Sequence, residues 1–446
     1  MFLVPNLTSL CRTSVNGLSS KCNVEAASFI LDTLFATWFK ISLLSRPSKF
    51  DSKGDVLTKV IDGVYWVGAV DWDVKNFHGY ITHRGTSYNA YVVKGEKTAV
   101  VDTVKENFAD TFLRHIKEIV EFEDIDYIIS NHAEPDHSGS LKALIDVAPQ
   151  AEVIASKRGK DSLQKYYGEL EITSIEEKPQ VDLGGKTLAF VAVPMAHWPD
   201  SMVTYIPEDK LLLSNDAFGQ HLASSERFND MVDQDLLWHE ATAYYANILL
   251  PLYRSVSRAI KALEGVDIEI IAPSHGVIWR DKPIEVIEKY LDWVNGVTKD
   301  RVVIAYDTMW KSTKNMAYAI AEGAGSTGVE TMVFNLTENH RSDVMTDILE
   351  AKAVLVGSPT LNNHVYPTAG GFLAYMRGLS PQKKIGAAFG SYGWAGGAKR
   401  FIEEQMKAAG IELIENDIEF SYKPTQEEWK KAYDFGKMIG EKIKSS

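Results

Sequence analysis

Four side chains of the kinds that bind metal ions lie within six residues of one another, in the run His-Ala-Glu-Pro-Asp-His that begins at His132. They are His132, Glu134, Asp136 and His137. The apolar run 125–130 comes directly before them and predicts a strand, so the four ligands follow a rigid element. A polar loop with helix-capping residues is the alternative interpretation. Because the chain has only 11 histidines, the motif favours a metal site.

Three later strand ends repeat this design, each with one ligand after an apolar run. The runs are 188–195 before His197, 211–214 before Asp216 and 268–273 before His275. Four histidines and three carboxylates suffice for two metal ions, and Asp216, alone on its strand end, is the best candidate for a bridging ligand. Taken singly, each histidine could be a hydrogen-bonded core residue, but their joint placement at strand ends argues against this. His78 and His221 could support the site or be ordinary surface residues.

A second group of residues could hold a phosphate. The strand expected at 302–307 is followed by Thr308-Met-Trp-Lys-Ser-Thr313, which opens a helix, so backbone N–H groups and hydroxyls lie at a helix N-terminus. A hydroxyl-rich helix start alone is also an ordinary capping signal. Two further strands, at 353–357 and 385–389, end in loops rich in aromatic residues and glycine. No glycine-rich Walker or dinucleotide fingerprint is present.

The elements that must position these residues form two α/β regions. From Val56 the chain begins with short β-rich runs (64–70, 89–93 and 98–102), followed by a helix at about 107–121 and strand-helix alternation. Helical periodicity covers 234–263, and another helix covers 282–297. After Lys299, βα alternation continues as in a doubly wound sheet. We therefore expect domains at 56–298 and 299–446, with residues 1–55 as a leader or extension of unknown role.

Composition excludes several classes of protein. The chain of 446 residues is 45% hydrophobic and 24% charged, which is typical of a globular protein, and its net charge of -13 argues against a nucleic-acid partner. The two cysteines, Cys11 and Cys22, lie in the first fifty residues, which argues against a disulfide scaffold, a thiolate zinc site or an iron-sulfur cluster. We expect a cytoplasmic protein. The segment 1–50 is basic and contains several serines, as transit peptides do, and if it is one, the protein would be located in an organelle matrix. Residues 26–44 fit an amphipathic helix.

These motifs resemble those of flavodiiron proteins. The resemblance covers residues 56–446 and rests on H-x-E-x-D-H and on the runs that begin at His197, Ser214 and Ser274. It implies a metallo-β-lactamase-like αββα sandwich followed by a flavodoxin-like doubly wound parallel sheet. Zinc hydrolases of the first fold usually have H-x-H-x-D-H, and a carboxylate in place of the second histidine favours iron. Two Fe ions per chain are implied: one bound by His132, Glu134 and His197, the other by Asp136, His137 and His275, with Asp216 bridging.

The resemblance also implies FMN at the switch point of the second sheet, where the loops after the first, third and fourth strands converge. Trp310, Tyr392 and Trp394 could pack on the flavin ring, although each could also belong to the core. The expected FMN-binding residues are Thr308, Met309, Trp310, Lys311, Ser312, Thr313, Pro359, Thr360, Leu361, Asn362, Ser391, Tyr392, Gly393 and Trp394.

The implied function is that of an oxidoreductase that reduces O2 to water, NO to N2O, or both. Two ferrous ions and a two-electron flavin hold four electrons, enough for O2. Because no cysteine-rich module follows, we expect a separate electron donor such as rubredoxin, or reduced deazaflavin, and a head-to-tail homodimer or dimer of dimers. A dizinc hydrolase with a flavodoxin-like docking module is the main alternative. A third is an electron-transfer or redox-sensing flavoprotein whose first domain is only structural.

Overall fold

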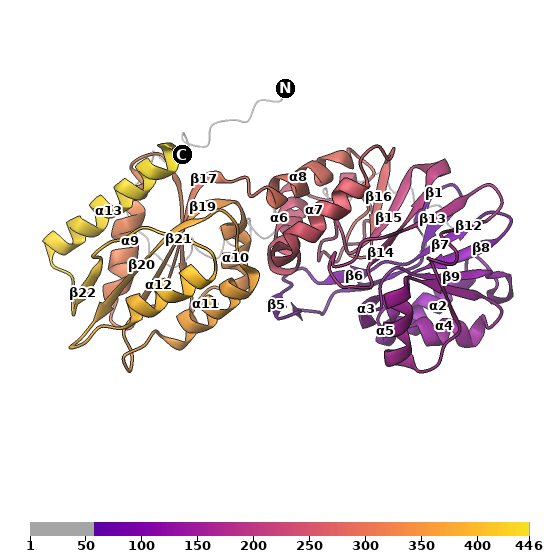
Figure 1. Cartoon of the computed structure of the whole chain (residues 1–446), viewed down its shortest axis with the longest axis horizontal. Helices are drawn as coiled ribbons and strands as arrows, with labels where there is room; N and C mark the ends of the chain where they lie inside the picture. The colour runs from indigo at the N-terminus through magenta and orange to yellow at the C-terminus, as the bar shows by residue number, and fades with distance from the viewer. Residues whose placement is uncertain (1–57, 446) are drawn as a thin grey trace, which may run out of the picture. The chain divides into compact units, whose positions relative to one another are not determined.

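The computed structural model describes residues 58–445 (Figure 1). The expectations for the leader at 1–55 and for a helix at 26–44 therefore lie outside the described residues. Among the helices of the described part, none is both long enough and apolar enough to cross a membrane.

Two sheets form the first part of the fold. One contains β1 (Thr58–Ile61), β2 (Val64–Trp66), β7 (Tyr91–Lys94), β8 (Thr98–Val101), β9 (Tyr127–Ser130), β10 (Glu152–Ala155) and β11 (Ile172–Ser174), in that order. The other contains β12 (Gln180–Asp182), β13 (Thr187–Ala192), β14 (Met202–Ile206), β15 (Leu211–Asn215) and β16 (Ile270–Pro273). Two short ribbons pair β3 (Ala69–Asp71) with β6 (Thr86–Tyr88) and β4 (Asn76–Phe77) with β5 (Tyr80–Ile81).

Alternating side chains explain why helices cover both outer faces. On β8, Ala99 and Val101 belong to the core between the sheets, whereas Val100 packs with the helices of the first sheet. Those helices are α2 (Ala109–Lys117), α4 (Leu141–Val147) and α5 (Lys157–Tyr167). The second sheet packs against α6 (Gln234–Tyr244), α7 (Tyr253–Ala262) and α8 (Ile284–Val294). The expected αββα sandwich is confirmed.

The second part is a parallel sheet in the order β18-β17-β19-β20-β21, which is the flavodoxin-like order. Its strands are β17 (Lys299–Tyr306), β18 (Glu330–Asn335), β19 (Ala351–Pro359), β20 (Ile385–Tyr392) and β21 (Glu412–Leu413), with β22 (Glu419–Ser421) also paired to β20. On β17, Val302 and Ile304 face α9 (Ser312–Gly325) and α13 (Gln426–Ser445). Val303 and Ala305 face the opposite side.

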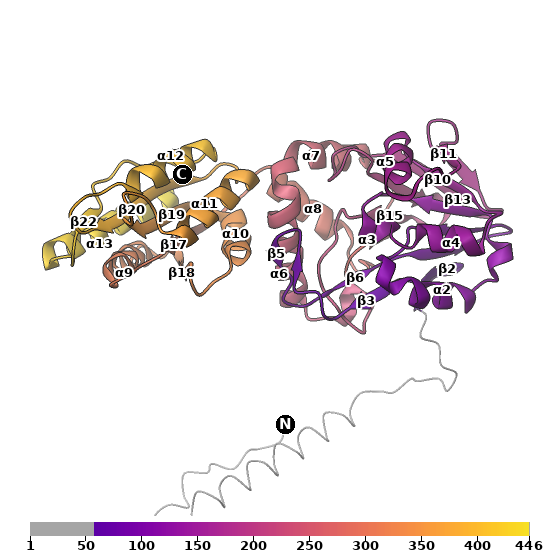
Figure 2. The same cartoon turned by 90° about the horizontal axis from the view of Figure 1, so that it is seen from below.

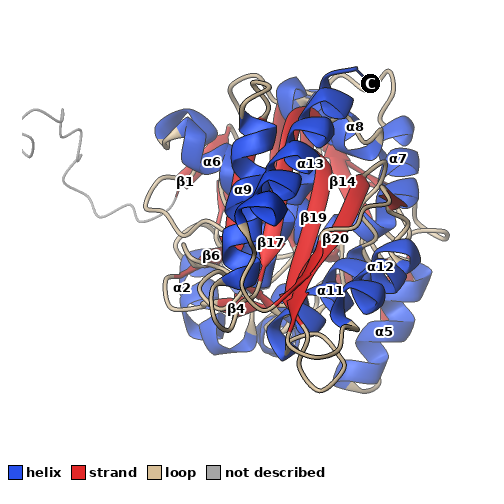
Figure 3. Ribbon diagram, turned by 90° about the vertical axis from the view of Figure 1, so that its left-hand side faces the viewer, coloured by secondary structure: helices blue, strands red, loops and turns tan. Residues whose placement is uncertain are grey.

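Three helices cover that opposite side, so the sheet lies between two helical layers (Figures 2 and 3). They are α10 (Arg341–Glu350), α11 (Pro367–Leu379) and α12 (Ala398–Ala408). The remaining short helices are η1 (Glu106–Phe108), η2 (Phe122–Asp124), α3 (Pro135–Ser138), η3 (Pro207–Asp209), η4 (Asn229–Met231), η5 (Tyr245–Leu249) and η6 (Leu250–Leu252).

Some element boundaries differ from those expected. The strand expected at 188–195 ends at Ala192, because the next residues form a loop closed by a hydrogen bond of 2.9 Å from the Val193 N–H to the Ser201 carbonyl. The helical stretch 234–263 is broken between α6 and α7 at Pro251, which has no N–H to continue a helix. The strand expected at 64–70 is divided into β2 and β3, and the helix expected at 107–121 is α2, preceded by η1.

Candidate metal centre

The H-x-E-x-D-H motif lies at the carboxyl end of β9. His132 lies two residues after the end of the strand, and Glu134 is the N-cap of the single-turn helix α3, with Pro135 at its first position. Asp136 and His137 therefore lie on a short helix rather than on a free loop. The Ser138 hydroxyl donates hydrogen bonds to the carbonyls of residues 133 and 134, at 2.8 and 3.0 Å, and ties this helix to the strand end.

The other three expected ligands come from the second sheet. Asp216 follows β15 and His275 follows β16, and these two strands are parallel, so their carboxyl ends meet at one edge. His197 lies in the loop between β13 and β14. The two sheets thus bring all seven expected ligands together, although the ligands are spread over 144 positions of the chain (132–275).

The ligand atoms fall into two groups around Asp216. One group is His132, Glu134, His197 and Asp216; the other is Asp136, His137 and His275. Within each group the ligand atoms lie within 4.8 Å of one another. Asp216 Oδ2 lies 3.1 Å from Nε2 of His197 and 3.5 Å from that of His132. Its Oδ1 lies 3.0 Å from Nε2 of His137 and 3.4 Å from that of His275. One carboxylate oxygen therefore faces each group, as in a bridging ligand.

The other two carboxylates each stay with one group. Glu134 Oε2 lies 3.3 and 3.4 Å from Nε2 of His132 and His197. Asp136 Oδ2 lies 3.3 and 3.2 Å from Nε2 of His137 and His275. All seven residues are buried, with at most 9% of their surface exposed. Three carboxylates buried close together repel one another and need positive charge beside them, which bound metal ions would supply.

Unpartnered polar atoms support the same conclusion. Both carboxylate oxygens of Asp136, Oδ2 of Asp216 and both ring nitrogens of His137 are buried and, although ligand atoms lie nearby, make no hydrogen bond of suitable geometry in the described structure. Buried polar atoms are normally satisfied, and metal ions would satisfy most of these. Imidazoles combined with hard carboxylate oxygens form a donor set that suits iron. The residues present therefore fit a dinuclear iron centre.

The charges of the cluster shift its pKa values strongly. Burial alone would lower the pKa of His132, but hydrogen bonds with Asp200 and Glu134 and the nearby Asp216 raise it to about 10. Burial would raise the pKa of Asp216, but His137 and His197 hold it well below its usual range. In the same way, the pKa of His197 is raised to about 10, against the effect of burial, by Asp216 and Glu134. The carboxylates are thus anionic, which is the form that binds metals.

Further residues orient the ligands, and the sequence interpretation missed one of them. Asp200 Oδ2 accepts a hydrogen bond from the Ala133 N–H at 2.7 Å and lies 2.9 Å from His132 Nδ1, which turns Nε2 of that ring toward the centre. The signal for Asp200 was its place three residues after His197. His275 Nδ1 lies 2.8 Å from the carbonyl of Ser87.

The two histidines that the sequence left ambiguous both lie at the centre. His78 Nε2 is 2.5 Å from Glu134 Oε1, the oxygen that faces away from His132 and His197. The His221 ring lies 4.7 Å from that of His275, and its Nδ1 is 2.7 Å from the hydroxyl of Thr86. The structure therefore brings both beside the ligands.

The expected flavin residues lie at the carboxyl edge of the parallel sheet β18-β17-β19-β20-β21. Thr313 and Ser391 are buried there, and their hydroxyl oxygens are 2.8 Å apart. The Thr360 N–H donates to the Ser391 carbonyl at 2.7 Å. Pro359, Ser391 and Tyr392 are the last residues of β19 and β20 rather than loop residues, because the strands extend beyond the expected 357 and 389.

The phosphate position expected at α9 has free donors. Lys311 precedes the helix with a φ of 69° and makes no side-chain capping bond, so the first backbone N–H groups are left for a ligand. The Thr308 hydroxyl is buried without a hydrogen-bond partner. Trp310 and Trp394 are 85% and 91% exposed, which rules out the core role that was the alternative for them. These residues fit a phosphate beside a flat aromatic ring. The residues that complete the expected set, Met309, Ser312, Leu361, Asn362 and Gly393, lie in the same loops or at the start of α9.

Each of the two parts of the fold matches a known protein family. Residues 86–276 match the ODP family beta lactamase, and residues 304–436 match flavodoxin. Fold and site together define a two-domain protein in which a metallo-β-lactamase-like domain with a dinuclear metal site precedes a flavodoxin domain.

Whole-chain relatives narrow this class to one family. The nitric oxide reductase of Moorella thermoacetica is 46% identical over 391 residues, which cover 86% of this chain and 98% of that protein. The rubredoxin oxygen:oxidoreductase of Desulfovibrio gigas matches the structure with a TM-score of 0.85 and 37% identity, covering 87% of this chain and 99% of that one. For the flavodiiron protein of Giardia intestinalis the TM-score is 0.85, the identity 36%, and the coverage 87% and 97%. The chain belongs to the flavodiiron proteins.

Proposed function

We propose that this protein is an oxidoreductase that reduces NO to N2O, O2 to water, or both, at a diiron centre supplied with electrons by FMN. The observation that carries the proposal is the arrangement of Asp216, with one oxygen toward each group of ligands. Two iron ions and a flavin bound here would supply the electrons that reduction of a diatomic gas requires. The M. thermoacetica relative named nitric oxide reductase and the D. gigas oxygen:oxidoreductase support the two substrates.

We assign the ligands as the resemblance implies. His132, Glu134 and His197 would hold one iron, Asp136, His137 and His275 would hold the other, and Asp216 would bridge them. The short Nε2 to carboxylate distances within each group support this division. His78 and Asp200 keep Glu134 and His132 oriented through their hydrogen bonds.

FMN is held by the fourteen residues named above, with its phosphate at the N-terminus of α9. The free N–H groups there and the unpartnered hydroxyl of Thr308 support this placement. Trp310 and Trp394, exposed at the same edge of the sheet, offer apolar surface to the flavin ring.

Electrons come from a separate protein such as rubredoxin, or from reduced deazaflavin. The name of the D. gigas relative supports rubredoxin. We further propose a head-to-tail homodimer, or a dimer of such dimers, in which the FMN of one subunit faces the irons of the other, in the cytoplasm. We also propose a domain boundary at 298/299, with residues 1–55 as a leader or extension.

Metal analysis and gas consumption test the function. The purified protein should contain two irons and one FMN per chain, and with reduced rubredoxin it should consume NO or O2 under otherwise anaerobic conditions. A colourless protein with zinc and hydrolytic activity would instead support the dizinc hydrolase. A protein with flavin and iron that consumes neither gas would favour the electron-transfer alternative.

A further inference from the structure

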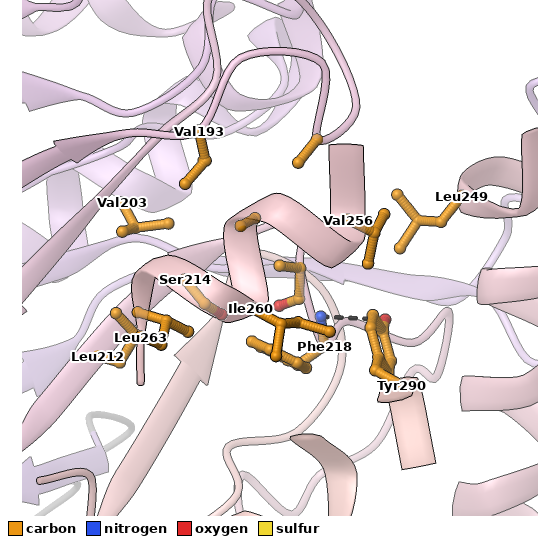
Figure 4. Close-up of a pocket in the computed structure, with 13 residues that line it drawn as sticks. Val193, Val203, Leu212, Ser214, Phe218, Leu249, Val256, Ile260, Leu263 and Tyr290 are labelled. Carbon is orange, nitrogen blue, oxygen red and sulfur yellow. Dashed lines mark hydrogen bonds between the residues drawn. The ribbon is translucent and has the colours of Figure 1, made fainter. Parts of the chain in front are cut away.

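A largely enclosed cavity lies between the β12–β16 sheet and the helices that pack on it (Figure 4). Its walls come from β14 and β15, from the loop before β14, and from α7 and α8. Val203 and Leu212 line it from the strands, and Val256 and Ile260 line it from α7. None of the residues assigned to the metal ions or to FMN lines this cavity.

The cavity is suited to remain dry. Of its 13 lining residues, all but Ser214 and Tyr290 are apolar. Both hydroxyls are already engaged: that of Ser214 donates to the carbonyl of Ala217 at 2.7 Å, and that of Tyr290 accepts from the N–H of Phe218 at 3.0 Å. A buried water needs two to four polar partners, and apolar cavities without them stay empty or bind apolar atoms such as xenon.

The cavity has room for one small molecule. The volume open to the centre of a water-sized sphere is about 20 Å³, just above the ~10–15 Å³ that a single water requires by this measure. A diatomic molecule is of this size, whereas larger substrates are excluded.

The cavity adjoins the metal ligands along the chain. Ser214 and Ala217 line the cavity on either side of Asp216, and Ala196 lines it next to His197. The hydrogen bond from Ser214 to Ala217 spans the turn that carries Asp216. The same turn is therefore a wall of the cavity and the support of the proposed bridging ligand.

We propose that this cavity is a binding site for a single apolar diatomic gas, from which NO or O2 passes to the metal centre. The inference rests on the proposed gas reduction and names the place where its substrate collects. Both gases are uncharged and hydrogen-bond weakly, so they gain by moving from water into apolar surroundings. The cavity raises the local supply of gas beside the turn that carries Asp216.

Xenon tests binding independently of turnover. Crystals of the full chain under xenon pressure should show one xenon atom among Val203, Leu212 and Ile260. Ala259→Leu, on α7, places a larger side chain in the cavity and should abolish the xenon peak. Ala262→Leu is the matched control, since it makes the same change at an exposed position of the same helix outside the lining. Leu263→Ala should enlarge the cavity and increase xenon occupancy. If Ala259→Leu fails to fold, Ala259→Val makes the smaller change.

Gas kinetics test the role of the cavity. Ala259→Leu should lower kcat/KM for NO or O2 at least about threefold while kcat at saturating gas, iron and FMN stay as in the parent protein. Ala262→Leu should leave kcat/KM unchanged. An absent xenon peak, ordered water in the cavity, or an unchanged kcat/KM in a variant that excludes xenon would each overturn the proposal. If the parent protein consumes neither gas, the proposed function is wrong, and so is the role of the cavity in supplying gas. The xenon peak then still decides whether the cavity binds apolar atoms.

Discussion

Replacing Asp216 by alanine should affect both metal ions at once. Asp216 Oδ2 lies 3.1 Å from His197 Nε2, and Asp216 Oδ1 lies 3.0 Å from His137 Nε2. When Asp216 is counted in both groups, each ion has four ligands, and the variant would leave each ion with three. His275→Ala, by contrast, takes a ligand from one group only. Asp216→Ala should therefore lower the iron content at both positions, and His275→Ala mainly at one.

The size of the loss follows from the position of the residue. Changing a residue that only supports a ligand typically weakens metal binding about 10–100-fold. As a proposed direct ligand, Asp216 contributes a negative charge to both ions. Its loss should therefore weaken the binding of each ion by more than about 100-fold, or roughly 2.7 kcal/mol per ion. Asp200→Asn, which alters only the partner of His132 Nδ1, should fall within the smaller range.

Iron per chain after dialysis against a weak chelator is the measurement, with FMN determined on the same samples. FMN content should not change, because the expected flavin residues lie around the β17–β21 sheet of the flavodoxin-like domain. Asp146→Ala, an exposed carboxylate on α4, is the control and should keep both irons. Circular dichroism shows whether each variant is folded. If folded Asp216→Ala keeps full iron and full gas reduction, the bridging assignment is wrong.

Three further predictions follow from the two sites and from one buried charge. Ser312→Ala combined with Thr313→Ala should lower FMN affinity about 10-fold or more, because it removes hydrogen bonds to the phosphate, and the iron content should not change. Unchanged FMN affinity would mean that the phosphate lies elsewhere. Mixing the His137→Ala chain with that double variant should restore part of the activity in exchanged dimers, and subunit exchange without activity would argue against electron transfer between subunits. Burial lowers the pKa of Lys384 to about 7. The unfolded chain then binds the extra proton between about pH 7 and pH 10, so stability should rise with pH in that window. In Lys384→Met the thermal midpoint should lack this rise, and an unchanged pH dependence would contradict the assignment.

The meeting of the seven expected ligands at one place was predictable because the apolar runs before them form strands. Strand ends fix side-chain directions, and parallel strands such as β15 and β16 place their carboxyl ends together. The parallel, doubly wound form of the β17–β21 sheet was predictable for a related reason, since βα alternation produces such a sheet, whereas its flavodoxin-like strand order came from the family resemblance.

The residues that support the ligands were harder to predict. Asp200 lies in a loop after a strand that ends earlier than expected, at Ala192, and only the folded loop brings it to His132. His78 reaches Glu134 from the β4–β5 ribbon, 56 residues away in sequence. Such contacts depend on how loops pack, and hydrophobic periodicity carries no information about them.

The origin of the ligands in two separate sheets has a consequence for metal exchange. Four ligands follow β9 of the first sheet and three come from the second, and Asp216 of the second sheet contacts His132 and His137 of the first. With the proposed ligands, each bound ion would therefore be a cross-link between the two layers of the sandwich, in the way that a disulfide joins distant segments. An ion can leave only when ligands from both layers release it, so dissociation should be slow and coupled to local opening at this edge. The metals would then stabilise the sandwich as well as carry out its chemistry.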